Sequence, residues 1–187
     1  MVEILQYGTP ETDAVLRVPA KAVPNKDITS PRIRTIIADM QKALGTQHDG
    51  VAIAAPQIGV PERIFIISGK VLKDSDAQKY AALPDTIVCI NPAITKRSKE
   101  TQVMEEGCLS VRWMYGKVRR AKRVTIEATD EFGKKFERGA SGLLAQIIQH
   151  EYDHLDGILF IDKAFDLEEI PPTDDAHTSS SDHPNSI

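Results

Sequence analysis

The sequence has few cysteines and lacks any long apolar run. Of its 187 residues only two are cysteines, Cys89 and Cys108, which is too few for a scaffold held together by disulfides. No stretch reaches the roughly 18 apolar residues of a transmembrane helix. The first residues lack a basic segment followed by an apolar one, so no secretory signal is evident. These absences favour a cytoplasmic protein that does not cross a membrane.

Acidic charge is concentrated at the C-terminal end. The whole chain has a formal net charge of -4. Residues 168–187 contain five acidic residues and no lysine or arginine, which leaves residues 1–167 at +1. The C-terminal segment is polar and has little to bury, a composition typical of disorder. We therefore expect one folded domain over 1–167 and a disordered acidic tail over 168–187.

An amphipathic helix is predicted over residues 29–45. Thr29 or Ser30 can cap its first turn, and Pro31 suits the first helical position. Apolar residues recur along it at helical spacing and form one stripe for burial. This pattern indicates a scaffold helix that packs on the outside of the domain.

The rest of the chain predicts short strands and a second long helix. Residues 69–86 are polar and mixed, which indicates a surface loop. The second helix is expected over 141–156, where Ser141 can cap its start and Gly157 can close its end. Five short runs have strand-like composition: 63–67, 87–91, 117–119, 124–128 and 135–138. The predicted fold is α+β, with small, mostly antiparallel sheets enclosing the second helix.

Residues 150–154 read His-Glu-Tyr-Asp-His, a spacing typical of metal hydrolases. On a helix, positions i and i+4 lie nearly above one another, so His150 and His154 can reach one ion. Glu151 then lies close enough to accept a proton from water. Both histidines continue the inward stripe of the helix, where bare imidazoles are costly unless they are bonded. A metal site is therefore favoured over two satisfied core histidines.

Cys108 is the candidate for a third ligand. It follows Gly107 between predicted strands, and a thiolate is a good ligand for first-row divalent ions. Two histidines, one cysteine and water would give a four-coordinate site with one open position, as catalytic sites require. Cys89 lies inside an apolar run, where a plain buried thiol is the better interpretation.

Three segments together resemble the peptide deformylase family. They are residues 50–57 (Gly-Val-Ala-Ile-Ala-Ala-Pro-Gln), 106–110 (Glu-Gly-Cys-Leu-Ser) and 149–155 (Gln-His-Glu-Tyr-Asp-His-Leu). The likeness extends from Ile4 to Phe160. It implies a cytoplasmic, bacterial-type hydrolase that removes the formyl group from the N-terminal formylmethionine of nascent polypeptides.

The resemblance also assigns roles to particular residues. The family's metal ligands fall on Cys108, His150 and His154, and its catalytic acid/base falls on Glu151. The oxyanion donors fall on the Gln57 side chain and the Leu109 backbone N–H. Gly50, Val51 and Ala52 would pair with the substrate main chain as an added strand, and Leu143 with Ile147 would line the methionine pocket. An ion pair between Glu106 and Arg120 would steady the cysteine segment.

The ligand types and the family resemblance suggest different metal ions. Cysteine and histidine ligands with one water suggest zinc by ligand type alone. The resemblance implies Fe(II) as the working ion, and we follow it, with Zn(II) or Ni(II) as substitutes in purified protein.

Two departures from the family pattern lie beside the expected cleft. Ala52 stands where the family has glycine, and we hypothesise that its Cβ narrows the cleft slightly. Arg112 and Trp113 follow Val111 where a Val-Pro pair is more usual. They belong either to the cleft rim or to an exposed loop.

Residues 112–123 contain six basic residues and no acidic one. They form either a ribosome-facing patch or, as we favour, the solvated face of a hairpin. We expect a monomer that binds no membrane or specific nucleic acid and meets the ribosome only transiently.

Two other functions are possible for such a sequence. A metalloprotease would need a third ligand after His154, where little beyond Asp156, Asp162 and the tail is available. A non-catalytic peptide-binding homologue would not need Glu151.

Overall fold

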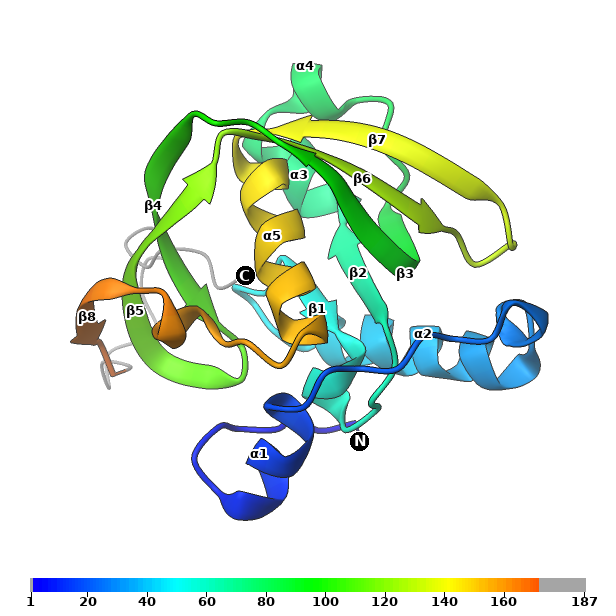
Figure 1. Ribbon diagram of the computed structural model, residues 1–187, viewed down its shortest axis with the longest axis horizontal. Coiled ribbons are helices and arrows are strands. Elements are labelled where there is room, and N and C mark those ends of the chain that lie inside the picture. The colour runs from blue at the N-terminus through cyan, green and yellow to red at the C-terminus, as the bar shows by residue number, and fades with distance from the viewer. Residues whose placement is uncertain (1, 172–187) are drawn as a thin grey trace.

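The computed structural model describes residues 2–171 and places two antiparallel sheets around helix α5 (Leu143–Leu155) (Figure 1). The five-stranded sheet has the order β1-β2-β3-β6-β7, and the three-stranded sheet has the order β4-β5-β8. α5 contacts strands of both sheets, which confirms the predicted α+β architecture with an enclosed helix. Within the described residues, no helix is long and apolar enough to cross a membrane.

The strands include all five predicted runs and three that were not predicted. The larger sheet contains β1 (Ala52–Ala54), β2 (Ile64–Ser68), β3 (Thr86–Arg97), β6 (Arg123–Thr129) and β7 (Lys135–Ser141). The smaller sheet contains β4 (Thr101–Cys108), β5 (Val111–Ala121) and β8 (Phe165–Glu169). The unpredicted strands are β1, β4 and β8.

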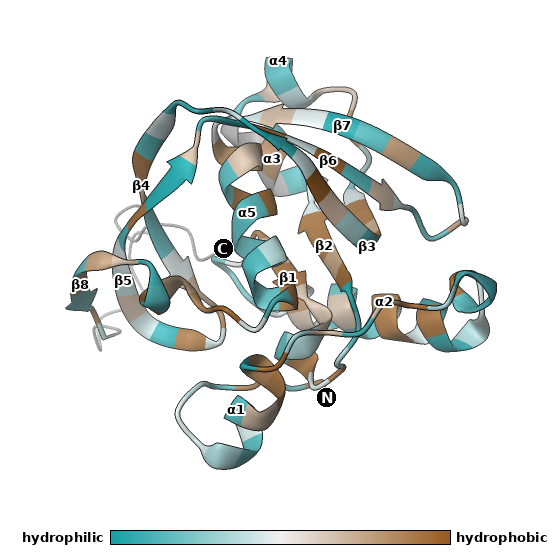
Figure 2. Cartoon of the chain, in the orientation of Figure 1, coloured by the Kyte–Doolittle hydropathy of each residue, from teal (hydrophilic) through white to brown (hydrophobic). Residues whose placement is uncertain are grey.

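Strand β2 separates two apolar clusters, which explains its continuous hydrophobic run. Ile64 and Ile66 face one cluster with α2 (Pro31–Gly45), and Phe65 and Ile67 face the other with α5. Figure 2 shows hydrophobic residues along β2 and on parts of α2. Full burial of each such side chain stabilises the fold by roughly 1.5–3 kcal/mol. α2 therefore packs outside the sheet, as predicted, and α5 packs inside.

The ends of the two long helices decide between two predicted caps and correct a third. Ser30, not Thr29, caps α2, because its side chain accepts from the Ile33 backbone N–H. Ser141 does not cap α5; it ends β7, and Gly142, with φ 61, turns the chain into the helix without a side-chain cap. At the other end, Gly157 has φ 73, the left-handed conformation expected there.

The predicted surface loop over 69–86 contains two short helices, α3 (Gly69–Ser75) and α4 (Ala77–Tyr80). Leu72, Tyr80 and Leu83 are buried in the cluster on the α5 side. The prediction was wrong because these few apolar residues are scattered among polar ones. A short helix, α1 (Pro10–Leu16), also precedes the first predicted helix.

Strand β8 runs through the position where the acidic tail was predicted to begin. Glu168 pairs with Tyr115, and Glu169 pairs with Met114 of β5. Residues 168–169 therefore extend the small sheet. Residues 172–187, to which the rest of the tail prediction refers, lie outside the described residues.

Candidate metal centre

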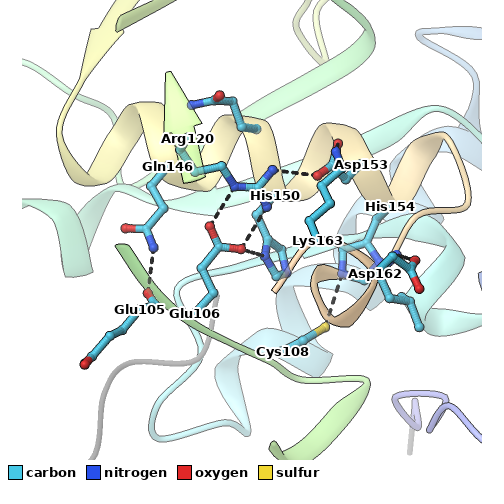
Figure 3. Close-up of polar contacts among 12 residues, drawn as sticks. Glu105, Glu106, Cys108, Arg120, Gln146, His150, Asp153, His154, Asp162 and Lys163 are labelled. Atoms are coloured by element: carbon cyan, nitrogen blue, oxygen red, sulfur yellow. Dashed lines mark hydrogen bonds and ion pairs between the residues drawn. The ribbon is translucent and has the colours of Figure 1, made fainter. Parts of the chain in front are cut away.

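Cys108, His150 and His154 come together beside α5 (Figure 3). One ligand atom from each lies within 4.8 Å of the others, and all three residues are buried. Cys108 Sγ is 3.2 Å from His154 Nε2, and the two imidazole centroids are 5.0 Å apart. Cys108 is the last residue of β4 and not, as predicted, part of a loop. A strand end and one helical turn thus bring the three predicted ligands into a single cluster.

The atoms in this cluster fit a divalent ion. His150 Nδ1 is 2.9 Å from Glu106 Oε2, which fixes the ring, whereas its Nε2 is buried without a hydrogen-bond partner. Burying a polar atom without a partner costs free energy, and coordination would remove that cost. Two neutral imidazoles and a thiolate are the donor set that zinc, iron and nickel share.

A buried ion-pair network contacts His150 through Glu106 (Figure 3). Arg120 donates to both Glu106 oxygens, at 2.7 and 2.8 Å, and to Asp153 Oδ2 at 2.6 Å. Lys163 Nζ donates to Asp153 Oδ1 at 2.7 Å. The Glu106–Arg120 ion pair was predicted, but its burial was not. Both side chains are at most 4% exposed, so removing one partner would leave a buried unpaired charge.

Three contacts in this network were not predicted: Glu106 with His150, Asp153 with Arg120, and Lys163 with Asp153. Asp153 lies within the His-Glu-Tyr-Asp-His segment, three residues after His150, so the helical spacing could have indicated a second inward carboxylate. No local pattern marks Lys163, which reaches Asp153 from the segment after α5.

Burial and neighbouring charges shift the pKa values in the centre. Burial raises the pKa of Glu106, but hydrogen bonds from Arg120 and His150 outweigh it and lower that pKa to about 2. Burial raises the pKa of the Cys108 thiol to about 12, so in the protein alone it keeps its proton. Burial, with His150 as the next cause, holds the pKa of His154 well below its usual range. A cation that replaced the thiol proton would meet an imidazole already in its ligating form.

Glu151 has the most perturbed environment among the predicted catalytic residues. It is fully buried, and both its carboxylate oxygens lack a hydrogen-bond partner. Burial, followed by the charge of Glu106, raises its pKa well above the ordinary value. A carboxyl group in this state readily exchanges a proton with a neighbouring group.

Gln57 lies next to Cys108 and Ser110. It belongs to the turn η2 (Ala55–Ile58), and its Oε1 accepts from the Ala54 N–H at 2.7 Å. Its Nε2 donates to Ser110 Oγ at 3.2 Å and lies 3.7 Å from Cys108 Sγ. The amide is therefore fixed with its donor toward the candidate ligands. The Leu109 side chain is buried, and its carbonyl accepts from Gln6 Nε2 at 2.9 Å.

The predicted substrate-binding residues lie along β1 and α5. β1 pairs with β2 along one edge and is an outer strand of the five-stranded sheet. Val51 and Ala52 are fully buried, and a Cβ at Gly50 would come within 2.9 Å of Leu44 Cδ1. Leu143 is partly exposed at the start of α5, whereas Ile147 is fully buried. Their roles stay predictions.

Arg112 and Trp113 lie in β5, so the alternative of an exposed loop was wrong. Arg112 contacts the segment that leads into β1. Its Nη1 lies 2.9 Å from Asp49 Oδ2, and its Nη2 donates to the Gln47 side chain. Trp113, with φ 66, is 37% exposed. This geometry favours the rim interpretation for Arg112, because it holds the residues next to Gly50.

Comparisons with known proteins agree with this arrangement. A family model described as polypeptide deformylase matches residues 1–169. A peptide deformylase from Roseiflexus castenholzii is 39% identical over 89% of this chain and 90% of its own length. One from Fusobacterium nucleatum is 42% identical over 86% of this chain and 82% of its own length.

Solved structures give the same result. The peptide deformylase from Thermotoga maritima has a TM-score of 0.73 and 32% identity, covering 88% of this chain and 98% of its own. The Acinetobacter baumannii enzyme bound to Met-Ala-Ser has a TM-score of 0.73 and 29% identity, covering 87% and 99%. The candidate third ligand lies upstream of α5, whereas the metalloprotease alternative required one downstream. The chain belongs to the polypeptide deformylase family, metal-dependent hydrolases that remove the N-formyl group from nascent peptides.

Proposed function

We propose that Cys108, His150 and His154 hold the metal ion of this deformylase, Fe(II) in the cell, with Zn(II) or Ni(II) as substitutes in purified protein. The observation that carries the proposal is the buried cluster of three ligand atoms within 4.8 Å. When bound, such an ion lowers the pKa of water toward about 7 and so supplies a hydroxide nucleophile at neutral pH. The choice of iron rests on the family resemblance, since the donors suit all three ions.

Glu151 acts as the general acid and base. It accepts the proton of the attacking water and later delivers it to the amine that leaves. Its burial and unpartnered oxygens support this role, because a carboxyl group with a raised pKa can both take and return a proton near neutral pH. General catalysis of this kind contributes roughly 10²- to 10⁴-fold to rate.

Gln57 and the Leu109 backbone N–H stabilise the negative charge that develops on the formyl oxygen. Gln57 supports this role because its carbonyl oxygen is held by the Ala54 N–H, which leaves the amide nitrogen oriented toward Cys108. A single preorganised donor of this type is worth about 3 kcal/mol in the transition state.

The formylmethionyl peptide lies along β1, with Gly50, Val51 and Ala52 pairing with its main chain. The position of β1 at the edge of its sheet supports this mode of binding. Leu143 and Ile147 line the pocket for the methionine side chain, one and two turns before His150. The Met-Ala-Ser bound by the similar Acinetobacter baumannii enzyme is a peptide of the kind that deformylation releases.

The protein works as a cytoplasmic monomer that meets the ribosome only transiently. Residues 112–123 do not supply a free basic patch, because four of their six cations have acidic partners. These pairs are Arg112–Asp49, Lys117–Asp166, Arg120–Glu106 and Lys122–Glu100. This pairing supports the interpretation of the segment as a hairpin face and not as a patch that binds the ribosome.

Formate release tests the proposal. The protein is purified anaerobically with Fe(II) and assayed with formyl-Met-Ala-Ser beside Glu151→Gln. We expect steady formate release from the wild type and a decrease of at least about 10²-fold in kcat for the variant, at equal metal content. No release from the iron-loaded wild type would overturn the proposal, and cleavage of internal peptide bonds would point to a protease.

A further inference from the structure

A cavity of about 610 Å³ lies at one end of the five-stranded sheet, away from the candidate metal centre. Its walls come from α4, the end of β3, the start of β6, the end of β7 and the first turn of α5, near the top of Figure 1. Neither the candidate metal ligands nor Glu151 or Gln57 lines it. The proposed deformylation chemistry leaves it without a role.

The walls of this cavity are strongly basic. Five cationic side chains line it and no acidic residue does: Lys79, Lys96, Arg97, Arg123 and Arg138. Among the side chains that the structure describes, which exclude those of residues 71, 74 and 75, none of the five forms an ion pair shorter than 4.0 Å. Four other cations of residues 112–123, in contrast, have acidic partners. A concave wall of one sign concentrates its potential inside the cavity.

The guanidinium group of Arg138 has a donor without a hydrogen-bond partner. Its Nε is buried and has no hydrogen-bond partner among the described residues, which is costly for a charged donor. Arg138 also borders a neighbouring cavity of about 260 Å³ that contains Asp130 and Glu131, yet it forms no ion pair with either. An anion in the basic cavity would offer acceptors to the Nη donors of Arg138, whereas the buried Nε would gain one only if the side chain moved.

The other wall residues indicate which anion would fit. Thr125 and Ser141 add polar residues to the walls, whereas Leu83 and Leu144 give the cavity an apolar part. Three guanidinium groups favour phosphate, whose oxygens match their paired donors, and two lysines add point charges. The walls converge from several elements, which favours a compact anion over an extended nucleic acid strand.

We propose that this cavity binds a polyphosphate anion, either free or attached to a nucleoside. The site lies outside the catalytic machinery, so the proposal stands whether or not the assigned roles in deformylation are correct. Lys96 and Arg97 are exposed, so replacing both with glutamine removes two charges without disturbing the core. Lys26 and Lys42 are also exposed, line neither this cavity nor the neighbouring one, and provide a matched control.

Isothermal titration of the nickel-loaded protein with tripolyphosphate, ATP and adenosine tests the site at low salt. We expect saturable binding of tripolyphosphate. Its Kd should rise at least about tenfold in Lys96→Gln/Arg97→Gln and change less than about twofold in Lys26→Gln/Lys42→Gln. Formate release should be equal in all three proteins. Tighter binding of ATP than of tripolyphosphate would identify a nucleotide site, and equal binding a site for free polyphosphate.

Several results would overturn the proposal. One is the absence of binding at millimolar tripolyphosphate. Another is binding that persists unchanged in Lys96→Gln/Arg97→Gln, because the anion would then sit elsewhere, such as at the metal. Equal weakening in the Lys26→Gln/Lys42→Gln control would indicate only general charge attraction. Binding of a single-stranded RNA without binding of tripolyphosphate would identify a nucleic acid surface instead.

Discussion

The candidate metal centre has two different halves. Charged side chains in ion pairs surround His150 (the ion-paired half), whereas uncharged groups surround Gln57 (the neutral half). In the ion-paired half, Glu106 contacts the imidazole, and Arg120, Asp153 and Lys163 continue the network from there. These side chains come from β4, β5, α5 and the segment after α5, so the network joins several elements around one ligand.

In the neutral half, Gln57 is held by the Ala54 N–H and by Ser110. The neighbouring strand β1 has no charged residue. A substrate amide loses its hydrogen bonds to water when it binds there. Uncharged donors in fixed positions can replace those hydrogen bonds. This difference in charge suggests that the two halves have separate functions. The ion-paired half binds the metal ion, and the neutral half binds the reacting peptide. The predictions below separate these two tasks.

Replacing Cys108 should have the largest effect. We expect Cys108→Ala to lose stoichiometric metal and all measurable formate release, because the cluster loses its thiolate donor. Cys89→Ala removes the other buried thiol, which lies in β3, and should keep both metal and activity. Metal analysis after dialysis measures the difference. Equal metal content in the two variants would show that Cys108 is not a ligand.

Replacing Arg120 should damage the ion-paired half. Arg120→Met leaves Glu106 and Asp153 without their shared partner, so we expect a loss of about 3–5 kcal/mol in the free energy of unfolding. Metal affinity should fall about 10- to 100-fold, since Glu106 orients His150. Lys163→Met, at a side chain 40% exposed, should cost less than about 1 kcal/mol. Urea unfolding and metal competition check both variants, and equal losses would rule out a buried network centred on Arg120.

Replacing Gln57 should affect turnover and not metal binding. We expect Gln57→Ala to lower kcat about 10²- to 10³-fold while metal content stays stoichiometric. Gln57→Glu keeps the Oε1 contact with the Ala54 N–H but removes the amide donor, so it should be similarly slow. If either variant lost its metal instead, the neutral half would also be needed to hold the ion.

Replacing Arg112 should have the smallest effect. The Arg112–Asp49 pair is partly exposed, so its loss should cost at most about 1 kcal/mol of substrate binding. We expect Arg112→Leu to raise KM up to about fivefold with little change in kcat, because the segment before β1 becomes less constrained. Arg119→Leu, at an exposed position on the same strand, is the control. Equal KM values in the two variants would show that Arg112 does not position the rim of the cleft.

Local patterns predicted the parts of the molecule that depend on neighbours in sequence. The helical spacing of His150 and His154, and the apolar stripe of α2, needed no tertiary information. β4 was missed because its residues alternate between exposed and half-buried until the last three, so no apolar run marks it. The contact between Lys163 and Asp153 depends on how the chain returns after α5, which sequence spacing does not encode.

X-ray absorption at the zinc edge of the zinc-loaded protein tests the central claim most directly. With Cys108, His150 and His154 as ligands, we predict one sulfur at about 2.3 Å and two imidazole nitrogens at about 2.0–2.1 Å. Cys108→Ala should abolish the sulfur shell, and Cys89→Ala should leave it unchanged. A wild-type spectrum with only nitrogen and oxygen neighbours would contradict the account.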